Sequence, residues 1–244
     1  MSPIPRNITI PGTLRLFFHD CYVQGCDGSV LILPADDNNS ERNASINLSL
    51  AGDAFDIVDI VKAALEKECP GVVSCSGILA ILARDVVHWR EGPHWQVEKG
   101  RRDGLISNAT EAQLLMPKSD ENITTLIRGF KSIGPTTADL ITLSGAHTIG
   151  FTHCIEFASR IFHNDTTLNS SIREKVIHSC PFPKIDRNSL RERKGLLLTD
   201  HVLAFGENDL SRKLEFAKAM VKLGRVGVKT VNEGEIRRDC KKFN

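Results

Sequence analysis

The sequence predicts a mainly α-helical protein. Apolar residues recur at helical spacing through most of the chain, capping residues bound these segments, and no alternating run indicates a large sheet. The chain has 244 residues, of which 41% are hydrophobic and 25% are charged. This length and composition allow a substantial core, in one large domain or in two lobes.

Charge and hydropathy narrow the classes of partner. The net charge is +1 with dispersed lysines and arginines, so neither nucleic acid nor an anionic membrane surface is an expected partner. No apolar run approaches the roughly 18 residues that span a bilayer. Residues 1–12 lack the hydrophobic core of a signal peptide, so the chain as given carries no export signal. A monomer with a small-molecule partner is expected.

The cysteines and glycosylation acceptors indicate an oxidising, secretory environment. Seven cysteines are many for a cytosolic protein of this size. Their odd number leaves at least one without an internal partner, unless two chains are cross-linked or part of the protein is missing. Asn-x-Ser/Thr acceptors begin at Asn7, Asn38, Asn43, Asn108, Asn122, Asn164 and Asn169.

The first half of the chain predicts helices separated by one long polar loop. A helix is expected around residues 14–20, followed by a short loop and then a surface loop over residues 34–52. Residues 54–68 form an amphipathic pattern that ends at Cys69-Pro70-Gly71. Residues 78–89 are apolar on nearly all faces, which is typical of a buried helix, and Ser74 or Ser76 can cap it.

The second half predicts one extended stretch and then further helices. Residues 93–104 indicate a small hairpin or an extended excursion with no large sheet to join. Helical spacing then resumes, with Thr136 and Gly224 among the caps. The expected helices cover residues 121–131, 136–143, 149–162, 169–178 and 209–224.

The densest chemistry lies in residues 14–29, LRLFFHDCYVQGCDGS. Arg15 and His19 are four residues apart, so on a helix a cation and a base lie on one face, with Phe18 beside them. Cys21 and Cys26 then bracket a loop rich in small residues, and Asp20, Asp27 and Ser29 supply oxygen ligands around it. This arrangement suits a hard cation.

A second candidate centre is His147 in LSGAHTIG, residues 143–150. The small residues Ser144, Gly145 and Ala146 precede it and would let a flat ligand approach the backbone. His147 is expected to open the next helix. The other six histidines are interpreted as ordinary core or surface residues: His88, His94, His153, His163, His178 and His201.

Seven segments, FFHDCYVQGCDGS, ERNASIN, VSC, GRRDG, LSGAHTIG, KGLLLTD and EIRRDC, resemble the plant secretory (class III) haem peroxidases. The resemblance runs nearly end to end and in order. It implies a single domain over residues 1–244 with haem b between distal and proximal helices and a minor β hairpin. The distal lobe would cover about residues 1–130 and the proximal lobe about residues 131–244.

The resemblance assigns the distal chemistry to five residues. His19 would be the acid and base for hydrogen peroxide, Arg15 would stabilise the charge on the departing oxygen, and Phe18 would form the wall of the cavity. Glu41 and Asn47 would hold the far nitrogen of His19. Asn47 also begins an Asn-Leu-Ser acceptor, and a glycan there would conflict with a buried role, so this acceptor is predicted to be unused.

The proximal and donor-binding roles follow from the same resemblance. His147 would be the axial iron ligand, and Asp200 would accept its second N–H, although Asp200 alone equally fits a helix N-cap. Pro117 would lie beside the haem edge where phenolic donors dock, the alternative being a surface-turn proline. The activity implied is the reduction of hydrogen peroxide with one-electron oxidation of phenols.

The resemblance also implies calcium and disulfide sites. A distal calcium would bind the side chains of Asp20, Asp27 and Ser29 and the carbonyls of Val23 and Gly25. Of the family's proximal calcium site only Thr148 and Asp186 remain, too few for a hard cation. The expected bridges are Cys21–Cys26, Cys75–Cys240 and Cys154–Cys180, with Cys69 unpaired.

Two departures from the family pattern bear on function. The family's N-terminal helix, which carries the partner of Cys69, precedes the start of this chain, and the segment after Cys180 is short. Two alternatives to an active peroxidase follow: a truncated relative that is poorly active or inactive, and a non-enzymatic, calcium-stabilised, disulfide-linked binding protein. By resemblance the protein is expected to be extracellular or vacuolar.

Overall fold

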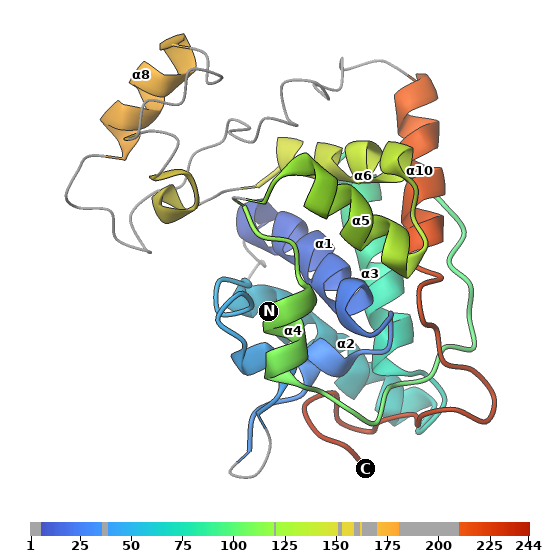
Figure 1. Ribbon diagram of the computed structural model, residues 1–244. Coiled ribbons are helices and arrows are strands. Elements are labelled where there is room, and N and C mark those ends of the chain that lie inside the picture. Colours follow the sequence, from blue (N-terminus) through green and yellow to red (C-terminus); the bar gives the residue numbers. More distant parts are fainter. Residues whose placement is uncertain are drawn as a thin grey trace.

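The computed structural model describes residues 6–35, 39–119, 121–150, 153–158, 162, 170–180 and 210–244. This part of the protein is mainly helical, as predicted (Figure 1). Asp186 and Asp200 lie outside the described residues, and so does the side chain of Thr148. None of the helices in the described ranges is long and apolar enough to cross a membrane.

Three helices form the centre of the molecule: α1 (Arg6–Val23), α2 (Gly52–Glu68) and α3 (Cys75–Trp89). They contact one another, and α3 presents buried residues on most of its faces, as its apolar sequence predicts. The side chain of Ser74 caps α3 by accepting from the Gly77 N–H at 3.1 Å. This decides between the two predicted caps.

Five further helices belong to the described part. Two of them, α5 and α10, pack against α6, whereas α8 stands apart from the others (Figure 1). Capping residues fix several starts: Asn108 and Asn122 accept from backbone N–H groups, and Thr136 forms a capping box with Asp139. The helices are α4 (Ala109–Leu115), α5 (Ile123–Ile133), α6 (Thr137–Ser144), α8 (Ser170–Ser179) and α10 (Leu210–Leu223).

Two predictions about the second half are wrong. Residues 149–162 do not form one helix: Ile149 is extended, Gly150 has φ 126°, and residues Cys154–Phe157 form the 3-10 helix η4. His147 therefore lies in a short 3-10 helix, η3 (Gly145–Thr148), and does not open an α-helix. The short helix α4 was missed, although the Asn108 cap followed by ATEAQLL is a start signal.

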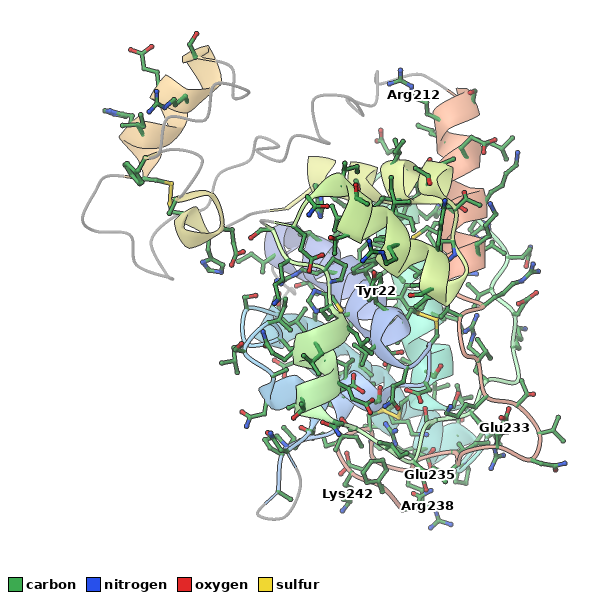
Figure 2. All side chains as sticks on the ribbon, viewed as in Figure 1. Tyr22, Arg212, Glu233, Glu235, Arg238 and Lys242 are labelled. Carbon is green, nitrogen blue, oxygen red and sulfur yellow. A yellow bond between two sulfur atoms is a disulfide. The ribbon has the colours of Figure 1, made fainter. Side chains whose placement is uncertain are left out.

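Residues 93–104 take the extended alternative and form no hairpin. They pair with the C-terminal segment through isolated β-bridges, one between Arg102 and Lys229 and one between Asp103 and Glu235. Figure 2 shows Glu235 on this segment. One hydrophobic core joins α1, α2 and α3 to Phe216, Met220 and other residues of α10, so it spans both predicted lobes.

Three disulfides close this framework, and they are the pairs that the resemblance implies. Cys21–Cys26 joins neighbours at the end of α1, Cys75–Cys240 ties the start of α3 to the C-terminal segment, and Cys154–Cys180 joins η4 to the end of α8. Among the described cysteines only Cys69, which is half-buried, is free.

Candidate active site and calcium loop

Arg15 and His19 extend from one face of α1, one turn apart. The neighbouring Leu14 and Leu16 are buried, whereas Arg15 is exposed. The guanidinium donates to the Ser49 carbonyl oxygen at 3.0 Å and to the Ser49 Oγ at 2.9 Å. These two bonds orient the guanidinium from the surface loop, a contact that the sequence did not predict.

His19 is buried, and its hydrogen bonds define which nitrogen carries the proton. Asn47 donates from Nδ2 to the Glu41 carbonyl at 2.8 Å, so its Oδ1 is left to accept from His19 Nδ1 at 2.7 Å. The proton therefore lies on Nδ1 of the neutral imidazole, and Nε2 is the acceptor. Burial first, and the nearby Arg15 charge second, lower the His19 pKa to about 3.

Glu41 supports His19 indirectly, through Asn47. Its backbone carbonyl accepts from Asn47, and no direct bond from Glu41 to His19 is present. Asn47 itself is buried, with both ends of its amide engaged, which gives a physical reason for the prediction that its acceptor carries no glycan.

Phe18 belongs to an aromatic cluster between α1 and α5. Its half-buried ring stacks on Phe130 with centroids 6.0 Å apart, and it lies 5.3 Å from Tyr22, a residue inside the bundle (Figure 2). The His19 ring meets Phe18 edge-on at 6.1 Å. Phe18 thus provides an apolar wall beside the predicted base.

His147 is exposed and follows directly after α6. Its segment lies against the N-terminal half of α1: a Cβ on Gly150 would be only 3.1 Å from the Pro11 Cβ. Pro11 precedes Arg15 by one turn of α1. The two predicted histidine centres are therefore carried by segments that pack together.

Buried oxygen atoms without hydrogen-bond partners among the described residues lie in and beside the predicted calcium loop, residues 20–29. Asp20 Oδ1, Ser29 Oγ and both carboxylate oxygens of Glu41 are buried and have no hydrogen-bond partner in the described part. Burial and then the Asp27 charge raise the pKa of Asp20, while burial and then the Asp20 charge raise the pKa of Glu41 to about 9. A bound Ca²⁺ would satisfy the buried oxygens of Asp20 and Ser29, so these two predicted ligands fit the ion, whereas Glu41 is not one of the predicted ligands.

The described residues contain no group of three or more His, Cys, Asp or Glu side chains placed to hold a metal. The expected calcium set has only two carboxylates, Asp20 and Asp27, and relies on a hydroxyl and two carbonyls for its other ligands. Val23 ends α1 and Gly25 follows it in the loop, at the positions the resemblance assigns to these carbonyls.

Asp103 and Arg237 hold the calcium loop against α3, and the sequence interpretation gave them no role. Asp103 accepts from the backbone N–H groups of Cys75, Ser76 and Arg237 at 2.8–3.1 Å. The fully buried Arg237 donates to the carbonyls of Gly28 and Gly104, both at 2.7 Å. Their signal was the motifs GRRDG and EIRRDC, which contain these two residues.

Pro117 lies at a turn beside the segment that follows His147. It is half-buried and comes directly after buried Met116 at the end of α4. Two residues later, Ser119 donates from Oγ to Glu156 of η4 at 2.7 Å. The predicted donor-docking turn thus contacts the chain on the His147 side.

Comparisons with known proteins agree with the resemblance. Residues 5–208 match the family model described as Peroxidase. Peroxidase 55 of Arabidopsis thaliana is 43% identical over 274 residues, covering 97% of this chain and 82% of the relative. Peroxidase 41 of the same plant is 41% identical over 97% of this chain and 82% of its own length, and Peroxidase 56 is 40% identical over 98% and 82%. These findings favour neither the inactive relative nor the non-enzymatic binding protein. The chain belongs to the peroxidase family and has the activity of a peroxidase.

Proposed function

We propose that this protein binds haem b and reduces hydrogen peroxide, with His19 as base, Arg15 as charge stabiliser and His147 as axial iron ligand. The observation that carries the assignment is the buried, neutral His19, whose Nε2 is left to accept a proton one turn from a fixed guanidinium. This is the arrangement that heterolysis of an O–O bond requires from the protein.

The residues present fit haem by their chemistry. His147 offers an exposed imidazole in a segment with small residues on one side and α1 on the other. Haem, when bound, supplies the redox chemistry by which peroxide gains two electrons. The partner of the second His147 nitrogen is proposed to be Asp200, which would make the imidazole a stronger electron donor.

His19 transfers the proton, and Arg15 stabilises the charge that develops during the reaction. Nε2 of His19 accepts the proton of the inner peroxide oxygen and returns it to the outer oxygen, which leaves as water. The Arg15 guanidinium stabilises the negative charge that develops on that oxygen, and its permanent charge makes lysine a poor substitute. Two phenol molecules, each giving one electron and one proton, complete the reduction of peroxide to two waters.

Calcium is proposed to complete a site whose first ligand, Asp20, directly follows His19 on α1. The ion would bind Asp20, Asp27 and Ser29 by side chain and Val23 and Gly25 by carbonyl. Since Asp20 is adjacent to His19 on α1, the ion would fix the end of the helix that carries the base. Thr148 and Asp186 are proposed to be too few to hold a second calcium.

Small phenolic donors are proposed to dock near Pro117. The Ser119–Glu156 bond supports this placement, because it brings the Pro117 turn to the segment that follows the axial histidine. We further propose a monomeric protein of one domain, with lobes near residues 1–130 and 131–244, that acts in the extracellular space or the vacuole.

The proposal is tested by refolding the full chain with haemin and calcium. The wild type should show a Soret band and peroxide-dependent oxidation of a phenol. His19→Ala should keep the Soret band and lose about 10²–10⁴-fold in kcat/KM for peroxide, whereas His147→Ala should lose the normal Soret band itself. His178→Ala, at an exposed position of α8, is the matched control. Haem-loaded His19→Ala with full turnover, or a folded wild type that takes up no haem, would refute the proposal.

A further inference from the structure

Two histidines that are six residues apart meet at the C-terminal end of α3. The ring centroids of His88 and His94 lie 5.6 Å apart, with an interplanar angle of 82°. Both residues are exposed. The sequence interpretation treated each as an ordinary residue on its own, because the turn that brings them together could not be foreseen. Neither histidine has a role in the proposed peroxidase site.

The backbone between the two histidines is fixed by the way α3 ends. The Glu91 N–H donates to the His88 carbonyl at 2.9 Å, and the Gly92 N–H donates to the Val87 carbonyl at 3.0 Å. Glu91 has φ 61°, so the pattern is a Schellman motif with a left-handed residue after the cap. A side chain on Gly92 would collide with Val87, since its Cβ would lie 2.5 Å from Val87 Cγ1.

Contacts with α10 hold the far side of this turn. Lys213 donates from Nζ to the Glu91 carbonyl at 3.0 Å. Trp95, directly after His94, is buried, and its ring meets Phe216 at 6.4 Å. His88 is thus anchored by α3 and His94 by a neighbour packed on α10. The backbone of both residues is therefore fixed before a ligand arrives, which lowers the entropy cost of binding.

The spacing of the rings suits a shared transition-metal ion. Metal–nitrogen bonds of about 2.0–2.1 Å place the centroids of two imidazoles on one ion roughly 5–6 Å apart. The end of a helix also favours a cation, because its carbonyl groups carry partial negative charge. Asp85 lies one turn before His88 on α3, on the same face.

The neutral ligands select the class of metal. Imidazoles prefer Cu²⁺, Ni²⁺ and Zn²⁺, whereas Ca²⁺ and Mg²⁺ prefer oxygen ligands. Arg84, Arg90 and Lys213 lie in this region together with Asp85 and Glu91, and Arg84 donates to Asp85 at 2.7 Å, so the imidazoles and not the local charge select the metal. Because the described residues contain no third His, Cys, Asp or Glu completing a metal group, water would fill the remaining positions.

We propose that His88 and His94 form a surface site for a divalent transition-metal ion, with Cu²⁺ preferred by the general order of affinities. The site uses none of the residues proposed to hold haem or calcium and does not depend on the proposed catalytic roles.

The test uses the tag-free full chain, refolded with haemin in calcium-containing buffer whether or not haem is taken up, and titrated with Cu²⁺ in equilibrium dialysis. One Cu²⁺ per chain should bind with a Cu²⁺ electron paramagnetic resonance signal split by imidazole nitrogens. His88→Ala and His94→Ala should each weaken this binding by at least about tenfold, whereas the exposed His178→Ala should not.

His88→Gln and His94→Gln serve as second variants that keep a polar side chain of similar size at each exposed position. Unchanged Cu²⁺ affinity in both single variants, or a wild type without the nitrogen-split signal, would overturn the proposal. Full turnover in haem-loaded His19→Ala would refute the catalytic assignment and leave the Cu²⁺ measurements unchanged, so failure of the catalytic assignment and failure of the metal site are distinguishable.

Discussion

The position of one proton on His19 is fixed by a chain of two hydrogen bonds. The Glu41 carbonyl accepts from Asn47, and Asn47 in turn accepts from His19 Nδ1. An amide whose donor end is already engaged can offer only its oxygen to the imidazole. The arrangement therefore selects the tautomer with an unprotonated Nε2, which is the form a base needs.

Replacing Asn47 by valine should remove the preference of His19 for the tautomer with an unprotonated Nε2. With no acceptor for Nδ1–H, the imidazole can rotate or change tautomer, and the buried N–H loses its partner. We expect kcat/KM for peroxide to fall about 10–100-fold, a typical effect of losing a group that orients an active-site histidine. Stopped-flow measurement of the reaction with peroxide checks this.

Asn43→Val is the matched control for this prediction, because Asn43 is an exposed asparagine in the same loop. It should react with peroxide at the wild-type rate. Equal losses in the Asn43 and Asn47 variants would show that the loop as a whole matters and that the hydrogen bond to His19 does not.

At the level of single residues, sequence reasoning found the chemical groups and missed how they are held. The four-residue spacing of Arg15 and His19 predicts their shared face because helix geometry is local. The bonds from Arg15 to Ser49 span 34 positions, and a single sequence carries no sign of such a contact. Glu41 accepts from Asn47 through its backbone carbonyl, and such a main-chain contact cannot be read from residue identity.

The calcium loop and the C-terminal segment cross at two glycines. Cys26 N–H donates to the Val226 carbonyl at 2.9 Å, and a Cβ on Gly227 would lie 2.6 Å from the Gln24 carbonyl oxygen and 2.8 Å from Gly25 Cα. Backbone atoms cannot move aside as a flexible side chain can. The close approach therefore requires glycine on both segments.

Gly227→Ala should consequently destabilise the protein and loosen the calcium loop. Gly71→Ala is a matched control, since Gly71 also has a left-handed φ, 70°, but has open space around its Cβ position. Gly71→Ala should lower the unfolding free energy by about 1–2 kcal/mol through backbone strain alone. Gly227→Ala should cost at least about 1 kcal/mol more and release calcium faster, as measured by urea unfolding and chelator competition. Equal losses of unfolding free energy in the two variants would contradict the close approach of the two segments at Gly227.

The helix that leads to His147 is tied to α10 by an ion pair. Lys222 lies 2.8 Å from Asp139, which also forms the capping box of α6. Burial alone would raise the pKa of Asp139, but the hydrogen bonds from Lys222 and Thr136 outweigh it and lower the pKa. The pair therefore contributes stability above the ordinary aspartate pKa, near 3.9, and this contribution is lost as pH falls through the lowered value.

Lys222→Met should lower the unfolding free energy by about 0.2–1 kcal/mol at pH 7, because Lys222 is half exposed and its pairing is screened. The difference from wild type should shrink below about pH 4, where Asp139 takes up a proton in the unfolded chain and then in the folded one. Lys218→Met, which breaks an exposed pair with Glu215, is the control and should show a smaller effect. A deficit of Lys222→Met that grows as the pH falls would contradict this sign.

Helix boundaries were predictable where a cap and a break are both local. The Thr136 capping box starts α6 as expected, and the end of α2 at Glu68 matches the Cys-Pro-Gly signal. The expected helix after His147 failed because apolar spacing continues through Ile149, while the backbone there is extended and Gly150 takes a left-handed φ. The pattern gives only the period of apolar residues, and it carries no sign of the close packing of Gly150 on Pro11.

A single core and one long-range disulfide hold the whole molecule together. Cys75–Cys240 closes a loop with a sequence separation of 165 and joins the start of α3 to the C-terminal segment. The chain-entropy model gives about 5 kcal/mol as an upper value for a loop of this length. The pairing came from the family resemblance, since seven cysteines by themselves allow many connectivities.

Replacing Cys75 and Cys240 together by serine should lower the unfolding free energy by about 2–5 kcal/mol in urea titrations. Cys69→Ser, at the half-buried free cysteine, should change it by no more than about 0.5 kcal/mol. A double variant as stable as wild type would mean that the core holds the C-terminal segment without the bridge.

Iron ligation by His147 is the point on which the proposed mechanism as a whole depends. The decisive measurement is the Soret spectrum and phenol-oxidation rate of haem-loaded His147→Gly, recorded with and without added imidazole. We expect the variant to lose the wild-type Soret band and peroxide-dependent turnover, and imidazole to restore both in part by replacing the missing ligand. A His147→Gly protein that keeps the wild-type spectrum and rate without imidazole would contradict the assignment.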